Sequence, residues 1–263
     1  METKYSNQKN VLILIKLLKE HGIKKIVASP GTSNMPLVAS VQQDDFFEVY
    51  SSVDERSAAY IACGMAAEKN EPVVITCTGA TASRNYMSGL TEAFYRKLPI
   101  LAITSTQDIS RLGQNAPQLI DRRVIPNDIA KMSIHLPSIY TLSEERNYAV
   151  LINSAILELT RNGGGPVHIN LTIADGRKDY DITELPNVNV ISRINNRDVF
   201  PELPNGKIGI YVGSHNVWSK KLTKNVEEFC RKFNAVVLVD NISNYKGEYA
   251  VFSKYCNISR KKK

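Results

Sequence analysis

Apolar and polar residues alternate along the first two thirds of the chain in blocks that suit helices and strands in turn. Val11, Leu14, Ile15 and Leu18 recur at the spacing of one helix face, and Gly22 is a suitable C-terminal stop. The pattern beyond them predicts strands over 23–28, 47–51, 72–76, 100–104 and 167–171, and helices over 55–68, 82–95 and 143–161. This alternation predicts an α/β fold, a doubly wound parallel sheet that the last of these strands closes.

The remaining third has a different pattern. Residues from 172 to about 205 are mixed and polar, with several prolines and no sustained period, as in a linker. Two strands, 207–213 and 235–240, then flank a helix over 222–233, which makes a partial second βαβ unit. We therefore predict a first domain over 1–175, a linker over 176–205 and the βαβ unit within 206–263.

Composition excludes several classes of protein. Of the 263 residues, 43% are hydrophobic, which is enough for a buried core. No run of about eighteen apolar residues occurs, and the first ten residues lack the apolar stretch of a secretory signal. We therefore expect a cytoplasmic protein without a membrane segment. The formal net charge is +7, but four basic residues lie in 260–263, and the remainder predicts no nucleic-acid partner.

The four cysteines are Cys63, Cys77, Cys230 and Cys256, and none of them has the close paired spacing of metal sites or redox motifs. We interpret them as reduced thiols. Cys63 and Cys77 lie in apolar segments, where cysteine commonly behaves as a small hydrophobic residue. No metal site is predicted from these residues.

Glu55 is the first candidate for chemistry. It lies where the strand 47–51 meets a helix rich in small residues, and open parallel sheets bind ligands beyond the carboxyl ends of their strands. If the small residues let this helix pack tightly against another surface, the carboxyl group is desolvated and its proton affinity rises. Such a group suits proton exchange with a weakly basic heterocycle. The alternative is an acid that only satisfies the helix start and its dipole.

A turn after the first strand is the second candidate. Pro30, Gly31 and Thr32 allow the backbone to approach a ligand closely, and Thr32 or Ser33 is expected to cap the following helix. Taken alone, this turn fits many proteins.

Two further segments complete the set. Thr78, Gly79 and Ala80 follow the strand 72–76, and Asn85 lies within the next helix. Gln118 lies in a polar loop, where its amide offers both a donor and an acceptor for a carboxylate. Both segments also fit ordinary turns or exposed loops.

Taken together, these segments resemble a known family. Ser-Pro-Gly at 29–31, Asp-Glu-Arg-Ser-Ala at 54–58, Thr-Gly-Ala-Thr at 78–81 and Asn-Ala-Pro-Gln at 115–118 resemble the pyrimidine-binding domain of thiamine diphosphate-dependent enzymes. The first two are most similar to menaquinone-pathway synthases, and the third is similar to acetolactate synthases as well. Ser33 departs from the menaquinone-pathway pattern, which has an arginine there for a substrate carboxylate, so the substrate stays open.

The resemblance implies that residues 1–175 bind the pyrimidine half of thiamine diphosphate. The implied role of Glu55 is to bind the N1′ nitrogen of the aminopyrimidine and activate the cofactor. The activity implied is that of a carboligase or decarboxylase of small 2-oxo acids. The implied cofactor contacts are Pro30, Gly31, Thr32, Thr78, Gly79, Ala80 and Asn85, and the implied substrate contacts are Ser33 and Gln118.

The resemblance also implies partners. The family holds magnesium and the diphosphate with a Gly-Asp-Gly domain that has no counterpart in this sequence, so we expect magnesium to bind only through an absent domain or a partner chain. A homo-oligomer, expected to be a dimer, and a separate diphosphate-domain chain are the implied partners.

The stretch 206–263 is about half as long as the central domain of the family, so we interpret it as truncated and expect the isolated chain to be inactive. A fragment of a longer protein, a subunit of a split enzyme and the product of an interrupted gene all fit this pattern. The alternative function is a non-catalytic interaction module that keeps the fold and pairs with a partner chain.

Overall fold

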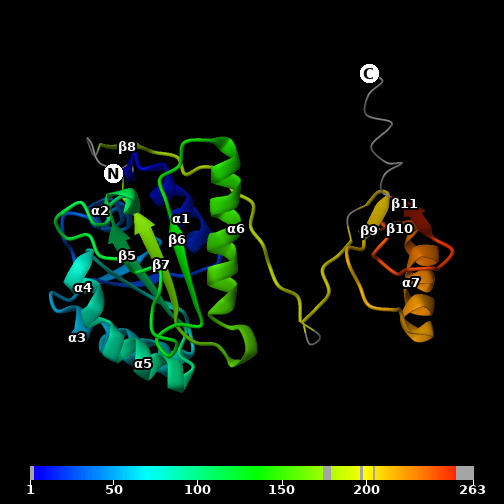
Figure 1. The fold of residues 1–263 in the computed structure, drawn as a ribbon, viewed down its shortest axis with the longest axis horizontal. Coiled ribbons are helices and arrows are strands. Elements are labelled where there is room, and N and C mark those ends of the chain that lie inside the picture. The colour runs from blue at the N-terminus through cyan, green and yellow to red at the C-terminus, as the bar shows by residue number, and fades with distance from the viewer. Residues whose placement is uncertain (1–2, 174–178, 196–197, 204, 253–263) are drawn as a thin grey trace. The chain divides into compact units, whose positions relative to one another are not determined.

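The computed structural model describes residues 3–173, 179–195, 198–203 and 205–252. It divides the chain into two compact units, residues 1–193 and 194–263 (Figure 1). The predicted domain boundary between 175 and 176, the thiol predicted at Cys256 and the basic residues 260–263 lie outside the described residues.

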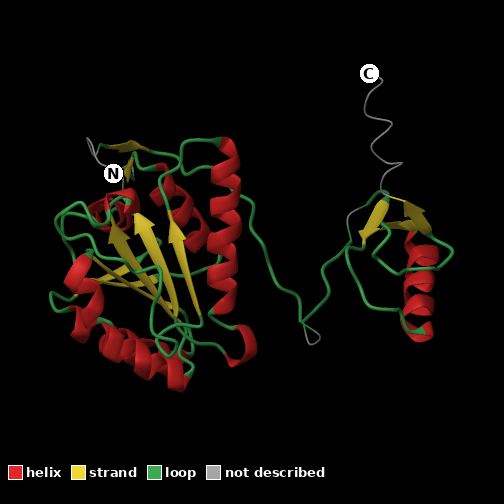
Figure 2. Cartoon of the chain, in the orientation of Figure 1, coloured by secondary structure: helices red, strands yellow, loops and turns green. Residues whose placement is uncertain are grey.

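A parallel sheet is the centre of the first unit (Figure 2). Within the described residues it has six strands in the order β3-β2-β4-β5-β7-β6, and every neighbouring pair is parallel. The strands are β2 Lys25–Ala28, β3 Glu48–Ser51, β4 Val73–Cys77, β5 Ile100–Thr106, β6 Met132–Leu136 and β7 Val167–Thr172. The predicted doubly wound parallel sheet is confirmed.

Helices cover both faces of this sheet, and each face has its own apolar core. On one face lie α1 Lys9–Glu20, α2 Met35–Gln42 and α6 Leu142–Glu158. On the other lie α3 Glu55–Lys69, α4 Ala80–Asn85 and α5 Met87–Arg96. The unit also contains 3-10 turns at Ile109–Arg111 and Arg161–Gly163 and a small antiparallel sheet of β1 Tyr5–Ser6 with β8 Tyr180–Ile182.

Helix caps in the sequence set where the helices begin. The side chain of Asp54 accepts a 2.7 Å hydrogen bond from the backbone N–H of Ser57, which makes Asp54 the N-cap of α3. Thr141 and Glu144 form a capping box at the start of α6. The cap at Asp54 therefore fixes Glu55 as the first residue of α3, directly after the carboxyl end of β3.

Several predicted elements differ from the structure. The helix predicted over 82–95 is two helices, α4 and α5, with the fully buried Tyr86 between them. The strand predicted to close the sheet, β7, lies between β5 and β6, so β6 is the edge strand. Polar residues alternate along β6, which weakens its apolar signal, and β8 lies within the predicted linker. These differences depend on tertiary packing, which a local pattern does not record.

The second unit is a small α/β unit. Within the part that the structure describes, β9 Ile208–Tyr211, β10 Ala235–Val239 and β11 Ala250–Phe252 form a parallel sheet in the order β11-β10-β9, packed with α7 Lys220–Phe233. The predicted βαβ unit is confirmed, and β11 is an additional strand. Ser219 caps α7 through the backbone N–H of Leu222 at 3.2 Å.

The described cysteines Cys63, Cys77 and Cys230 are free thiols, as predicted, and all three are buried. Burial raises the pKa of Cys63 to about 11 and that of Cys77 to about 12, so both are neutral near pH 7. Among the described residues, every helix is too short or too polar to span a lipid bilayer.

Candidate functional site

Most of the predicted site residues follow the carboxyl ends of parallel strands. The chain runs from β2 to its neighbour β3 and then, through α3, to β4 on the other side of β2. The loops after β2 and β4 therefore flank the topological switch point of the sheet, where open α/β sheets bind ligands. Glu55, after β3, and Gln118, in the long loop after β5, lie at the same end of the sheet.

Gly31 and Thr78 bring the first two loops into contact. A Cβ added to Gly31 would lie 2.2 Å from Cγ2 of Thr78, so the side chain of Thr78 packs against the backbone of Gly31 and leaves no room for a methyl group. Gly31 is half-buried and Pro30 is exposed, so the turn is partly open to solvent. This close approach is what the sequence predicted for a glycine in the turn.

Asn34 holds this turn in place, a role that the sequence analysis missed. Its Oδ1 accepts a 2.8 Å hydrogen bond from the backbone N–H of Gly31, and its Nδ2 donates to the carbonyl of Ser29 at 3.2 Å. Asn34 is also the N-cap residue of α2. The prediction that Thr32 or Ser33 caps α2 is therefore wrong, and the side chain of Asn34 turns back to the loop instead.

Ser33 points towards β5. Its hydroxyl lies 2.6 Å from the hydroxyl of Ser105, which is buried near the carboxyl end of β5. Ser105 is a second residue that the sequence analysis missed, because serine inside an apolar strand carries no local signal of function. The loop after β2 is thus connected to both β4 and β5.

Gly79 packs against the end of β5 and the long loop. A Cβ on Gly79 would lie 3.1 Å from the carbonyl oxygen of Ser105 and 3.2 Å from that of Gln118. Ala80 and Gln118 both have positive φ angles, 51° and 56°, in the left-handed region that residues other than glycine rarely adopt. The structure therefore brings Thr78, Gly79 and Ala80 together with Gln118, whose side chain is exposed.

Glu55 and Asn85 meet across two helices. Nδ2 of Asn85, the last residue of α4, donates a 2.9 Å hydrogen bond to Oε2 of Glu55, the first residue of α3. Glu55 is half-buried and Asn85 is exposed. Among the described residues, Oε1 of Glu55 has no hydrogen-bond partner in the chain. One carboxylate oxygen is thus oriented by an amide, and the other is available to a ligand.

Small residues let α3 pack closely, as the sequence predicted. Ala58, Ala59 and Ala62 are buried, and a Cβ on Gly89 of α5 would lie 2.4 Å from Cβ of Ala59. This contact covers one side of α3 only. The opposite side carries Tyr60 and Ile61, whose exposed fractions are 45% and 43%.

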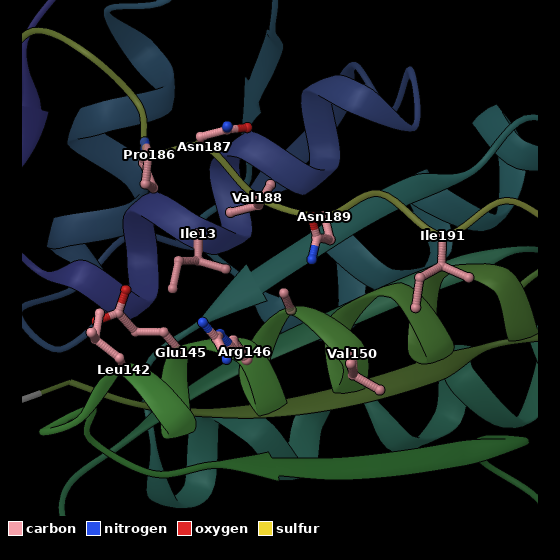
Figure 3. A pocket seen from close by; sticks show the side chains of 11 residues that line it. Ile13, Leu142, Glu145, Arg146, Val150, Pro186, Asn187, Val188, Asn189 and Ile191 are labelled. Carbon is pink, nitrogen blue, oxygen red and sulfur yellow. The ribbon is translucent and has the colours of Figure 1, made fainter. Parts of the chain in front are cut away.

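A cavity of about 310 Å³ lies away from these residues (Figure 3). Ile13 of α1, the first turns of α6 and the segment 186–191 line it, and most of the lining is apolar. None of the predicted site residues contributes to it. In the described part of the chain, no three His, Cys, Asp or Glu side chains are grouped to hold a metal ion.

Comparisons with known proteins match the part of the chain that contains these motifs. Residues 11–124 match the family model for the thiamine pyrophosphate enzyme, N-terminal TPP binding domain. Curated relatives from Bacteroides thetaiotaomicron and Phocaeicola vulgatus, both named 2-succinyl-5-enolpyruvyl-6-hydroxy-3-cyclohexene-1-carboxylate synthase, are 36% and 37% identical over 196 residues. These alignments cover 74% of this chain and 35% of each relative.

A protein of the same name from Flavobacterium johnsoniae is 27% identical over 241 residues, covering 88% of this chain and 43% of the relative. The chain therefore spans about a third of the length of the first two relatives. These matches confirm the resemblance that the motifs predicted.

Proposed function

The chain belongs to the thiamine pyrophosphate enzymes through its N-terminal TPP binding domain, residues 11–124, and we propose that this domain binds the pyrimidine half of thiamine diphosphate. Glu55 is the residue that exchanges a proton with the N1′ nitrogen of the pyrimidine. The hydrogen bond from Asn85 to Glu55 carries the proposal, because it holds a carboxylate at the carboxyl edge of the sheet with its second oxygen available.

The glycine loops lie at the same edge of the sheet as Glu55. Gly31 and Gly79 lie in loops where added side-chain atoms would collide with neighbouring residues, so both loops pack closely at this edge of the sheet. Thr78 and Ala80, the first residue of α4, flank Gly79, and Pro30 and Thr32 flank Gly31. The long loop places Gln118 beside them, where its exposed amide is available to a substrate carboxylate.

When bound, thiamine diphosphate supplies carbanion stabilisation for reactions of 2-oxo acids. The part played by this chain is to control a proton. Oε1 of Glu55 holds the proton at N1′, while the amide of Asn85 fixes the orientation of the carboxyl group. Glu55 is half-buried, and a bound pyrimidine ring would exclude water from its carboxyl group. The hydrogen bond between Oε1 and N1′ would then be stronger.

The whole protein is proposed to be a carboligase or decarboxylase of a small 2-oxo acid. Magnesium, and with it the diphosphate, would be held by a further domain or a partner chain; among the described residues no three His, Cys, Asp or Glu side chains are grouped to hold a metal ion. The exposed Tyr60 and Ile61 on α3 favour a homodimer or a paired diphosphate-domain chain that covers this side of the helix.

A thermal-shift titration tests this function. Thiamine diphosphate and magnesium are added to the chain alone, and to the chain mixed with a protein that carries a diphosphate-binding domain. We expect a saturable rise in melting temperature that is larger in the mixture, because ligand binding stabilises the folded state. The matched control is thiamine diphosphate with its aminopyrimidine ring replaced by a benzene ring. Indifference to the cofactor in both samples would contradict the proposal and favour an interaction module.

A further inference from the structure

Polar side chains form part of the surface of the sheet on the side that α3 and α5 cover. Ring nitrogens of His168 on β7 lie 2.8 Å from the hydroxyls of Thr104 on β5 and Ser133 on β6. Burial lowers the pKa of His168 to about 3, so its ring is neutral near pH 7. The segment before β6 lies over this surface and contributes Arg122 and Ile129.

Arg122 is a buried cation on this surface. Its side chain is only 3% exposed, and Nη2 donates a 2.6 Å hydrogen bond to the carbonyl of Ser105. Nε and Nη1 are buried and have no hydrogen-bond partner. Burial lowers the pKa of Arg122 to about 10, which still leaves it charged near pH 7. A buried charge without a counter-ion is unfavourable, so an anion that accepts hydrogen bonds from Nε and Nη1 would stabilise this guanidinium.

The neighbouring groups of the chain do not supply that anion. The carboxylate of Asp121 is engaged by Arg123, whose Nε and Nη2 donate to it at 2.9 Å and 2.6 Å. Burial raises the pKa of the Cys77 thiol to about 12, so the thiol is neutral. Within the described residues, no ion pair joins Arg122 to a carboxylate.

A cavity of about 20 Å³ lies beside Arg122. Its lining includes a second basic residue, Arg84, together with Ser83, Thr104 and apolar side chains, and no acid is among the lining residues. A space of roughly 10–15 Å³ is enough for one water-sized particle, so this cavity suits one small particle. The positive lining favours a particle with negative charge.

We propose that this cavity binds one small inorganic anion of the size of chloride, held by Nε and Nη1 of Arg122. The anion neutralises the buried guanidinium and satisfies donors that otherwise have no acceptor. Arg122 also holds the carbonyl of Ser105, and Ser105 contacts Gly79 and Ser33. Anion binding therefore stabilises the same loops that form the carboxyl edge of the sheet, whatever ligand that edge binds.

The test measures the melting temperature of the full chain as sodium chloride replaces sodium gluconate at constant ionic strength. We expect a rise that saturates as single-site binding does. The Arg122→Gln variant removes the cation and is expected to lose the rise. Arg123→Gln is the matched control, because Arg123 is exposed and neighbours Arg122 in sequence. It is expected to keep the full response.

Chloride-35 line broadening gives a second measurement on the unmodified chain, so the result does not depend on the folding of Arg122→Gln. We expect saturable broadening, and an affinity about threefold weaker in Arg84→Gln, because removing the exposed Arg84 weakens the field only modestly. The absence of saturable broadening, or equal chloride responses of Arg122→Gln and Arg123→Gln, would overturn the proposal. Neither measurement uses thiamine diphosphate, so the outcome of both is independent of the proposed function.

Discussion

Gly31 and Thr78 are packed so closely that a Cβ on Gly31 would lie 2.2 Å from Cγ2 of Thr78. The two residues follow β2 and β4, the strands on either side of the topological switch point. The side chain of Thr78 therefore fills the space beside Gly31, and a methyl group at Gly31 would collide with it.

Gly31→Ala is expected to destabilise the first unit by about 1–3 kcal/mol, the usual effect of overpacking. Thr78→Ser removes the Cγ2 atom that the new methyl group meets, so the double variant should recover most of this loss. Urea unfolding followed by far-UV circular dichroism measures the change. Trp218 is the single tryptophan and lies in the second unit, so its fluorescence transition is the internal control and should not move. Failure of Thr78→Ser to rescue would contradict the contact.

Two glycines in neighbouring helices are expected to respond in opposite directions to alanine. A Cβ on Gly89 would lie 2.4 Å from Cβ of Ala59, whereas a Cβ on Gly64 would meet no atom within 4 Å. Gly89→Ala should therefore destabilise the chain by about 1–3 kcal/mol. Gly64→Ala should stabilise the monomer by about 0.5–1 kcal/mol, because alanine favours an exposed helix interior.

The same urea unfolding experiment compares the two variants. Equal destabilisation by both substitutions would show that α3 and α5 do not meet at Gly89. A Gly64→Ala variant that is stabilised only under dissociating conditions would instead place Gly64 in an interface between copies of the chain.

The sequence predicts the strands well where apolar runs are continuous. All residues of β4, β5 and β7 are buried, and such runs are typical of strands covered on both faces. β6 is less obvious because Ser133 and His135 alternate with apolar residues and contact polar groups of β7. Whether β6 or β7 forms the edge depends on pairing across the sheet, which no local pattern contains.

The site is predicted in part. Gly31, Gly79 and Glu55 carry local signals, because glycines and a lone acid after strands mark places where ligands bind. Asn34 could have been found, since asparagine commonly bonds its own turn. Arg122 could not, because its neighbour Arg123 has the same chemistry and only the fold decides that one is buried and the other exposed.

His168 should make the stability of the first unit depend on pH. Its pKa falls from 6.5 to about 3 on folding because burial disfavours the charged ring. Between these two pH values His168 binds a proton in the unfolded chain but not in the folded chain. The free energy of unfolding is therefore unaffected by the titration of His168 above about pH 6.5, and it decreases as the pH falls towards 3. The slope is about 1.4 kcal/mol per pH unit at its steepest.

His168→Gln cannot take up this proton, so its unfolding free energy should change less steeply with pH than that of the unmodified chain. Urea unfolding at several values between pH 6 and pH 4, followed by circular dichroism, measures the difference. His215→Gln is the control, because His215 is exposed in the second unit. If the pH dependence of His168→Gln and His215→Gln is the same, His168 is not buried as a neutral ring.

Glu55→Gln tests the proton-transfer role directly. Glutamine has nearly the same shape and can still accept a hydrogen bond from Asn85, but it cannot exchange a proton at N1′. In an assembly that contains a diphosphate-binding domain, turnover of a 2-oxo acid should therefore fall about a hundredfold or more. The melting temperature without cofactor should stay unchanged, because Glu55 is only half-buried in the chain.

Glu68→Gln is the matched control for this experiment, since Glu68 is an exposed acid of the same helix. It should leave turnover unchanged. The exchange rate of the cofactor proton, followed by NMR in deuterated water, separates activation from binding: Glu55→Gln should slow exchange while the cofactor stays bound. Full exchange in Glu55→Gln would show that another group controls the proton, and that Glu55 serves only the start of α3 and its contact with Asn85.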